Sequence, residues 1–266
     1  MKNWKKFASN YPYLIWILFY AILLWLMLSG LMLGRYEISF TFLLLLYFIC
    51  FSIASLPEAE LIWRAFQGVR EIATNREKER LLPLFKEVYE EAKKVDKDLF
   101  KDIKLFIKDT MEINAFAFGQ RTLVITKGSI NLLSDDDLKG LMAHELGHFS
   151  NYDTVAIVFS SVSNIIMESF LRFLCWITRP IKFINNFFIG IHKGLVFIGD
   201  LILMDCSRKH EFLADNFASK CGYGENLTST LYQFYETSMS EPTKFIEQLR
   251  STHPPLVNRI EKLEEL

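Results

Sequence analysis

Two histidines spaced one helical turn apart are the residues of this chain best suited to do chemistry. They belong to the segment His144-Glu145-Leu146-Gly147-His148. On a helix, side chains at i and i+4 share one face, so both imidazoles can reach one Zn²⁺ at about 2.0–2.1 Å. A glutamate beside such a metal can take a proton from water and pass it to a leaving amine. The pattern predicts a zinc site for peptide-bond hydrolysis, with Glu145 as general base and acid.

The sequence around the histidines predicts the helix that this geometry requires. Ser134 can cap the N-terminus, and Asp137 three residues later can complete a capping box. Over residues 138–150 the apolar side chains recur at helical spacing, so one side can pack into a core. We expect the histidines to lie on the side that faces a cleft.

A third metal ligand is expected further along the chain, because catalytic zinc usually has three protein ligands and a water. Glu211 is the best candidate, since Asp215 follows it at i+4 on the same predicted helix. Asp215 would then accept the outer N–H of a ligating histidine and fix the orientation of its ring. His210, beside Glu211, is the alternative third ligand.

Four segments of the chain resemble a known family, and they occur in the same order. They are residues 114–119, His144 to His148 with Asn151 and Asp153, residues 207–215, and His253-Pro254-Pro255 with Arg259. Together they resemble the HtpX-type membrane zinc metallopeptidases. The prenyl-protein (CAAX) endopeptidase is a member of the same superfamily.

The resemblance implies a role for each segment. It implies one Zn²⁺ per chain on His144, His148 and Glu211, with Glu145 as base and acid and His253 stabilising the tetrahedral oxyanion. The residues that it implies for binding the substrate backbone are Asn114, Ala115, Phe116 and Ala117. The residues that it implies as structural neighbours of the site are Asn151, Asp153 and Arg259.

For two of these assignments, the local sequence also fits a purely structural role. His253 precedes Pro254, which favours an extended loop lining a cleft, but a surface histidine in a turn fits equally well. Residues 113–126 have the pattern of a β-hairpin with Gly119-Gln120 at its turn. An exposed edge there could bind an extended peptide by strand addition, whereas a purely structural hairpin fits the same pattern.

Two uncharged apolar runs near the N-terminus predict a transmembrane hairpin. Residues 13–33 and 38–56 are each long enough to cross a hydrocarbon core of about 30 Å as a helix. No small-residue cleavage site ends the first run, so we expect it to stay in the protein. Basic residues before the first run and after the second predict that the N-terminus and the catalytic domain are cytoplasmic.

A later apolar region, residues 155–204, is interrupted by charged residues. Glu168 and Arg172 stand at i and i+4 in its first half, and His192, Lys193 and Asp200 interrupt its second half. These groups would be costly if they met lipid unpaired. We favour a second membrane hairpin, partly because the family commonly has one here, over a hairpin resting on the bilayer surface. His192 is expected to face protein or the interface, not a metal.

Composition argues against several other classes of protein. The 266 residues carry a formal net charge of −1 without an aromatic-interleaved basic patch, so nucleic acid is not an expected partner. The sequence contains no phosphate-binding glycine loop, so no nucleotide is expected, and no serine or cysteine nucleophile beside a base. The four cysteines show no paired spacing, which fits a reducing cytosol.

The predicted fold is an integral membrane, mainly α-helical protein with a gluzincin-type zinc metallopeptidase domain and a small β-sheet. We expect an N-terminal transmembrane hairpin in residues 1–57 and a cytosolic catalytic region in 58–153. A second membrane or interfacial hairpin is expected in 154–206, and the rest of the catalytic domain in 207–266.

The resemblance implies a zinc endopeptidase of the cell membrane, with polypeptides and the lipid bilayer as partners. Its implied substrates are misfolded or damaged membrane proteins. One alternative is a zinc-binding membrane adaptor without proteolysis, but a closed structural zinc site has no need of Glu145 as a base. Another is a prenyl-protein processing endopeptidase, whose deep intramembrane chamber four spans at most cannot easily enclose.

Overall fold

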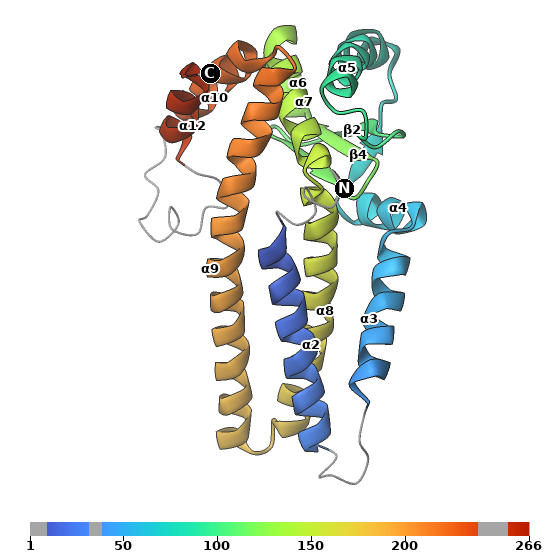
Figure 1. Cartoon of the computed structure of the whole chain (residues 1–266), viewed down its shortest axis with the longest axis vertical. Helices are drawn as coiled ribbons and strands as arrows, with labels where there is room; N and C mark the ends of the chain where they lie inside the picture. The colour runs from blue at the N-terminus through green and yellow to red at the C-terminus, as the bar shows by residue number, and fades with distance from the viewer. Residues whose placement is uncertain (1–9, 32–38, 239–254, 266) are drawn as a thin grey trace.

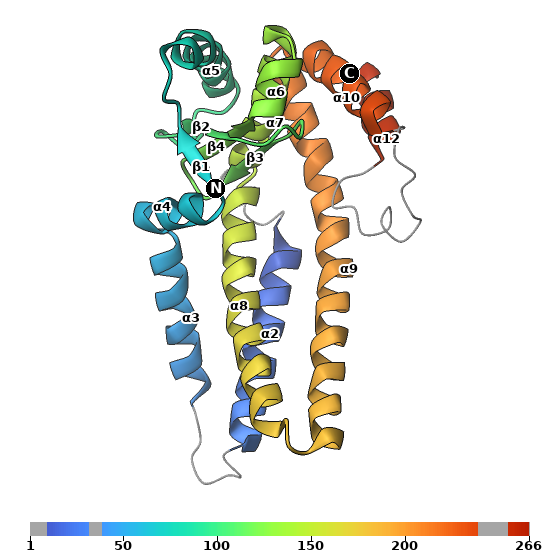
Figure 2. The same cartoon turned by 180° about the vertical axis from the view of Figure 1, so that it is seen from behind.

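Four of the described helices are long rods that lie side by side and carry the other elements at one end (Figures 1 and 2). The computed structural model describes residues 10–31, 39–238 and 255–265. The rods are α2 (Tyr11–Leu31), α3 (Phe40–Ala54), α8 (Asp153–Thr178) and the lower part of α9 (Lys182–Lys220). α2 packs against the other three. By length and hydropathy, α2 and α8 can each cross a membrane.

α3 differs from the predicted second span. It has 15 residues, which a rise of about 1.5 Å each makes roughly 22 Å long, shorter than a hydrocarbon core. α3 is long enough to cross a membrane only when it is taken together with the next helix, α4 (Pro57–Phe66). The axes of the two helices differ by 72°. Leu56 is extended (φ −71°, ψ 147°) because a residue before proline disfavours the helical region, so the helix breaks there. Residues 34–37, predicted as the turn before this helix, lie outside the described residues.

The second apolar region forms α8 and the first half of α9. α9 is one helix of 39 residues that runs on to Lys220, so the segment predicted as a membrane hairpin and the segment carrying Glu211 are continuous. A boundary drawn after residue 206 therefore falls inside a helix. α8 begins at Asp153, directly after Tyr152, whose left-handed backbone (φ 63°) turns the chain away from α7 (Asp135–Ser150).

A small mixed sheet contributes the hairpin expected at residues 113–126. Its strands are β1 (Val69–Glu71), β2 (Lys104–Lys108), β3 (Ala115–Phe118) and β4 (Thr122–Thr126), in the order β1-β2-β4-β3. β3 pairs antiparallel with β4, and β4 pairs parallel with β2. β3 is therefore one of the two edge strands of the described sheet, and the turn after it uses Gly119 at φ 63°, a conformation that favours glycine.

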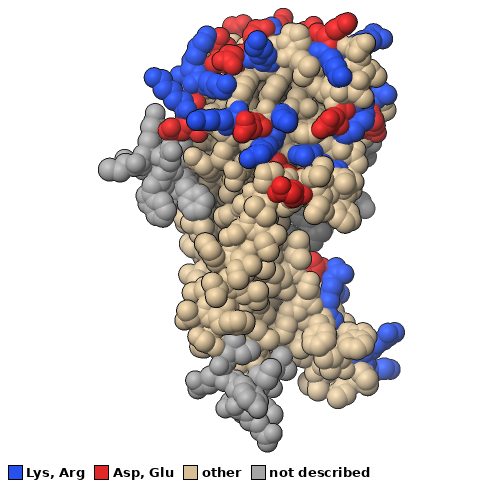
Figure 3. Space-filling view, turned by 90° about the vertical axis from the view of Figure 1, so that its right-hand side faces the viewer, with Lys and Arg blue, Asp and Glu red and all other residues tan. Residues whose placement is uncertain are grey.

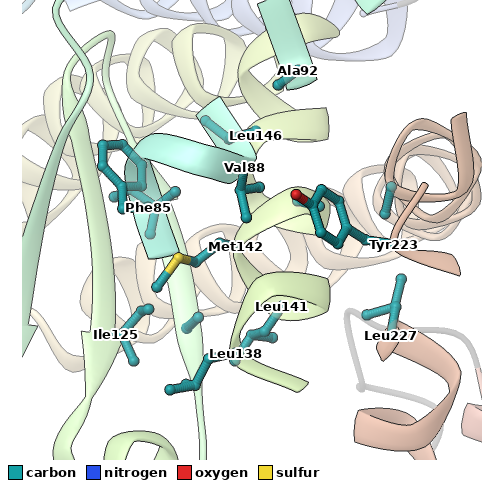
Figure 4. Packing of buried hydrophobic residues seen from close by; sticks show 14 of the residues in the cluster. Phe85, Val88, Ala92, Ile125, Leu138, Leu141, Met142, Leu146, Tyr223 and Leu227 are labelled. Atoms are coloured by element: carbon teal, nitrogen blue, oxygen red, sulfur yellow. The ribbon is translucent and has the colours of Figure 1, made fainter. Parts of the chain in front are cut away.

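α7 is the central helix of the domain at the end of the rods. The predicted capping box is present: Ser134 Oγ accepts from the Asp137 N–H at 3.1 Å, and Asp137 Oδ2 accepts from the Ser134 N–H at 3.4 Å. Buried side chains of α7, among them Met142 and Leu146, pack against the sheet, α5 (Asn75–Val95) and α10 (Gly224–Ser238) (Figure 4). The short helices α6 (Lys127–Leu132) and α12 (Leu256–Glu264) complete the domain.

Candidate metal centre

α7 and α9 bring two histidines and a glutamate to one point. His144 Nε2 lies 3.5 Å from Glu211 Oε2, and His148 Nε2 lies 3.6 Å from Glu211 Oε1. One ligand-type atom from each of the three residues lies within 4.8 Å of the others. The structure therefore brings together the three residues that the sequence predicted as metal ligands.

Glu211 reaches the histidines because α7 and α9 approach closely at two small residues. A Cβ built on Gly147 would lie 2.7 Å from the Cα of Ala214 and 3.0 Å from its carbonyl oxygen. Any side chain at position 147 would push the helices apart. The glycine inside the histidine motif thus sets the distance across the site.

The outer nitrogen of each histidine is held by a carboxylate. His144 Nδ1 lies 2.9 Å from Asp215 Oδ1, and His148 Nδ1 lies 2.9 Å from Asp153 Oδ2. A carboxylate on Nδ1–H fixes the tautomer, so each Nε2 keeps its lone pair for the point shared with Glu211. This donor set fits a metal ion. Asp215 occupies the place that its spacing predicted, and Asp153 holds the second histidine.

Arg259 brings a buried positive charge to these acids. It is 5% exposed and binds Asp215 through two hydrogen bonds, Nε to Oδ2 at 2.8 Å and Nη2 to Oδ1 at 2.6 Å. Its Nη1 lies 2.9 Å from Glu211 Oε2. Burial lowers the pKa of Arg259, but Asp215 and Glu211 raise it by more, so the guanidinium stays charged. Arg259 therefore balances carboxylates that would otherwise be uncompensated in the interior.

The same carboxylates change the protonation of the histidines. Burial and the charge of Arg259 lower the pKa of His144, but hydrogen bonds to Asp215 and Glu211 raise it more strongly, to about 10. Burial lowers the pKa of His148, but its hydrogen bond to Asp153 and the negative charges of Glu211 and Glu145 together raise it by more. A raised pKa favours the protonated imidazole, so a metal ion binding to these histidines competes with protons.

Glu145 lies in the interior on the same helix as both histidines. It is 5% exposed. Its negative charge raises the pKa of His148 and of Arg259, so it lies within electrostatic range of the cluster. It is therefore positioned beside the site that it was predicted to serve.

β3 lies along the same helix. It packs against α7, and β4 pairs with only one of its edges. Of the four residues predicted to bind substrate, Asn114 is exposed, Ala115 is buried, and Phe116 and Ala117 are half-buried. The Asn114 N–H donates to Ser129 Oγ at 2.8 Å, which fixes the backbone where the strand begins.

Two predicted site residues remain, His253 and Asn151. His253 lies outside the described residues. Asn151 is the C-cap of α7, and its carbonyl oxygen accepts from Asn10 Nδ2 at 3.0 Å. It lies at the end of the metal helix, joined to the start of α2.

His210 and Tyr13 are further neighbours of the site; the sequence indicated His210 only as an alternative metal ligand and did not indicate Tyr13. His210 Nδ1 lies 3.0 Å from Asp153 Oδ1, so it faces the acid that holds His148 and not the point shared by the ligands. The group of ligand-type atoms that the described residues bring together contains Glu211 and not His210. The ring of Tyr13, in α2, lies 6.0 Å from the ring of His210. Nothing in the apolar run of α2 indicated that Tyr13 lies near the site, because that contact is with a residue almost 200 positions away.

Comparison with known proteins agrees with this geometry. Residues 76–266, most of the chain, match peptidase family M48. The chain belongs to this family. M48 membership implies a metal, and the cluster of His144, His148 and Glu211 can hold one. The long apolar helices and the M48 relatives make this a membrane protein.

Its M48 relatives include proteins described as protease HtpX homologs. That of Dictyoglomus thermophilum is 31% identical over 189 residues, covering 60% of this chain and 62% of the relative. That of Tropheryma whipplei strain TW08/27 is 33% identical over 192 residues, covering 61% of this chain and 66% of the relative. The matched region thus spans slightly less than two thirds of the length of these relatives.

A solved structure shares the fold. The crystal structure of Ste24p from S. mikatae superposes with a TM-score of 0.60 at 19% sequence identity, covering 99% of this chain and 67% of that chain. The likeness confirms the predicted fold, mainly helical with a small sheet, and the match to family M48 makes it a metallopeptidase fold.

Proposed function

We propose that this protein is a zinc-dependent endopeptidase of the cell membrane that cleaves misfolded or damaged membrane proteins. The observation that carries the proposal is the convergence of His144, His148 and Glu211, with Glu145 on the same helix as both histidines. Membership of family M48 and similarity to HtpX homologs support it.

The three ligand-type residues are the proposed zinc site. Zinc bound there would act as a Lewis acid and lower the pKa of a bound water toward about 7. Asp215 and Asp153 would keep the two imidazoles oriented, and Arg259 would hold Asp215 and Glu211 in place.

Proton transfer is assigned to Glu145. Its carboxylate would take a proton from the attacking water and deliver it to the leaving amine. Because the side chain is buried beside the cluster, bulk water does not screen it. His253, on the strength of the family resemblance, is proposed to hold the developing oxyanion.

The substrate is proposed to bind as an added strand. β3 has one edge not paired in the sheet and packs against the helix of the histidines. Main-chain groups of an extended peptide could pair with Ala115 to Phe118, which brings its carbonyl groups toward the site. We propose that the N-terminus and this domain face the cytoplasm, as the basic residues flanking the first two apolar runs indicate.

Replacing the base tests this function directly. Wild type and Glu145→Gln would be purified in detergent, stripped of metal by chelation, and given zinc before incubation with casein. We expect both to bind zinc and only the wild type to cleave. Cleavage by Glu145→Gln at the wild-type rate would exclude the mechanism. Zinc binding without cleavage by either protein would favour a membrane adaptor.

A further inference from the structure

Helix α4 carries Glu60 and Arg64 toward the protein and its large apolar residues outward, and its third charged residue, Glu58, is exposed in the first turn. Leu61, Ile62 and Phe66 are 60%, 59% and 87% exposed, whereas Glu60 is 4% exposed. A helix at a water surface has the opposite arrangement, with its apolar face buried and its charges outside. The outer face of α4 therefore suits surroundings other than water.

The charges on the inner face of α4 are satisfied by the protein. Glu60 Oε1 accepts from the Gln120 N–H and Oε2 accepts from the Thr122 hydroxyl, both at 2.7 Å. Arg64 Nη1 donates to the same Thr122 oxygen at 2.7 Å and lies over the ring of Phe106, 4.4 Å from its centre. Glu60 and Arg64 therefore do not need water as a partner, and the exposed Glu58 can stay at the level of the polar headgroups.

The place of α4 in the chain defines what lies beside its outer face. α4 follows α3, which has no charged residue, after a break of two residues and at an angle of 72°. If α3 enters the bilayer, α4 lies close to the membrane plane at the end of α3 (Figure 2). On the side of the molecule that carries α3 and α4, charged residues gather over the upper domain, and the lower part carries mostly uncharged ones (Figure 3).

The inner face of α4 also packs against the edge strand. The ring of Trp63 stacks on Phe118 with centroids 3.8 Å apart and planes 6° from parallel. It meets Phe116 edge-on at 5.9 Å. α4 therefore separates β3 from the surroundings of the outer, apolar face of α4.

We propose that α4 is a membrane-interface helix whose partner is the lipid bilayer, and that it holds β3 at the bilayer surface. Leu61, Ile62 and Phe66 lie among lipid headgroups and the upper acyl chains, as in helices that rest in the interface. The face is continuous with an apolar membrane helix, which favours lipid over a second protein chain. A stable protein interface also engages about 20–30 residues a side, many more than this face offers.

Depth-dependent fluorescence quenching tests the proposal without relying on catalysis. Single cysteines replacing Leu61, Ile62 or Phe66 would be placed in the full chain with its native cysteines changed to alanine, labelled with bimane, and reconstituted in phosphatidylcholine vesicles. The lipids would carry a nitroxide either near the headgroup or deep in the acyl chain. Leu132→Cys, on α6 in the upper domain, is the matched control, because Leu132 is also 60% exposed.

We expect the headgroup-proximal nitroxide to quench the three α4 labels about threefold more strongly than the Leu132 label, and more strongly than the deep nitroxide does. Equal quenching at α4 and at Leu132 would overturn the proposal. So would stronger quenching by the deep nitroxide, which would make α4 part of a broken span, or a blue-shifted but unquenched label, which would indicate a protein partner.

The cysteine replacements themselves could prevent folding. Phe66→Cys can then be labelled briefly in the otherwise native chain, because Phe66 is 87% exposed whereas Cys50 and Cys175 are half-buried and Cys221 is buried. The wild-type chain, with all four native cysteines, gives the background labelling to subtract. The same pattern of quenching is expected, and its absence would again overturn the proposal.

Discussion

Gly147 of α7 lies against Ala214 of α9 so closely that a Cβ on the glycine would come within 2.7 Å of the alanine Cα. Gly147 precedes one predicted metal ligand, His148, and Ala214 precedes Asp215, which holds the other histidine. The separation of the two helices, and with it the span of the metal site, is therefore set at this contact.

Gly147→Ala is expected to weaken zinc binding at least about tenfold and to destabilise the protein by about 1–3 kcal/mol, because the added methyl meets backbone that cannot move aside. Alanine is otherwise favoured over glycine in a helix by about 1 kcal/mol. Gly190→Ala on α9 is the control, since a Cβ there meets nothing within 4 Å. Zinc titration and thermal unfolding in detergent measure both effects, and equal zinc affinity for the two variants would refute the role of the contact.

Asp153→Asn should weaken zinc binding by about 10–100-fold, the usual cost of losing a carboxylate that orients a metal-binding histidine. The amide keeps the size of the side chain but removes the charge that holds His148 and His210. Asp136→Asn, an exposed acid in the first turn of α7, is the control. Competition with a chelator measures the affinity. A change no larger than that of the control would show that Asp153 does not support the metal.

Arg259→Ala is expected to lower the free energy of unfolding of the metal-free protein by about 3–5 kcal/mol, because it leaves Asp215 and Glu211 buried without a compensating charge. Glu261→Ala, an exposed position on the same helix α12, should change it little. Unfolding is followed with chelator present, so that loss of metal does not contribute. Equal stability of the two variants would mean that the carboxylates become protonated at little cost.

Acid should remove a stabilising ion pair between β1 and α5. Arg70 donates to Glu77 Oε1 at 2.7 Å, and this hydrogen bond lowers the pKa of Glu77 from 4.5 to about 2. A lowered pKa in the folded state stabilises the protein above pH 4.5, and that contribution is lost as the pH falls toward 2.

Glu77→Gln should therefore be less stable than the wild type at pH 6 and should lose less stability between pH 6 and about pH 3. Glu79→Gln, an exposed position in the same turn of α5, is the control. The test is the melting temperature of wild type and both variants, measured between pH 6 and about pH 3. Parallel pH curves for wild type and Glu77→Gln would contradict the prediction.

The candidate metal residues could be predicted from the sequence because they depend on spacing within single helices. His144 and His148, and likewise Glu211 and Asp215, are related by the i, i+4 geometry that any helix imposes. The capping box at Ser134 and the hairpin before it are local for the same reason. Apolar runs predict membrane helices because hydropathy is a property of contiguous sequence.

The tertiary structure decided which distant residues complete the site. Arg259 and Asp215 are 44 positions apart, and Asn10 and Asn151 are 141 apart, so no local pattern relates them. The bend that turns Glu60 and Arg64 of α4 inward and the continuity of α9 through its predicted boundary also depend on packing. Spacing along one helix fixes a geometry in advance, whereas contacts between helices exist only once burial and close packing have chosen their arrangement.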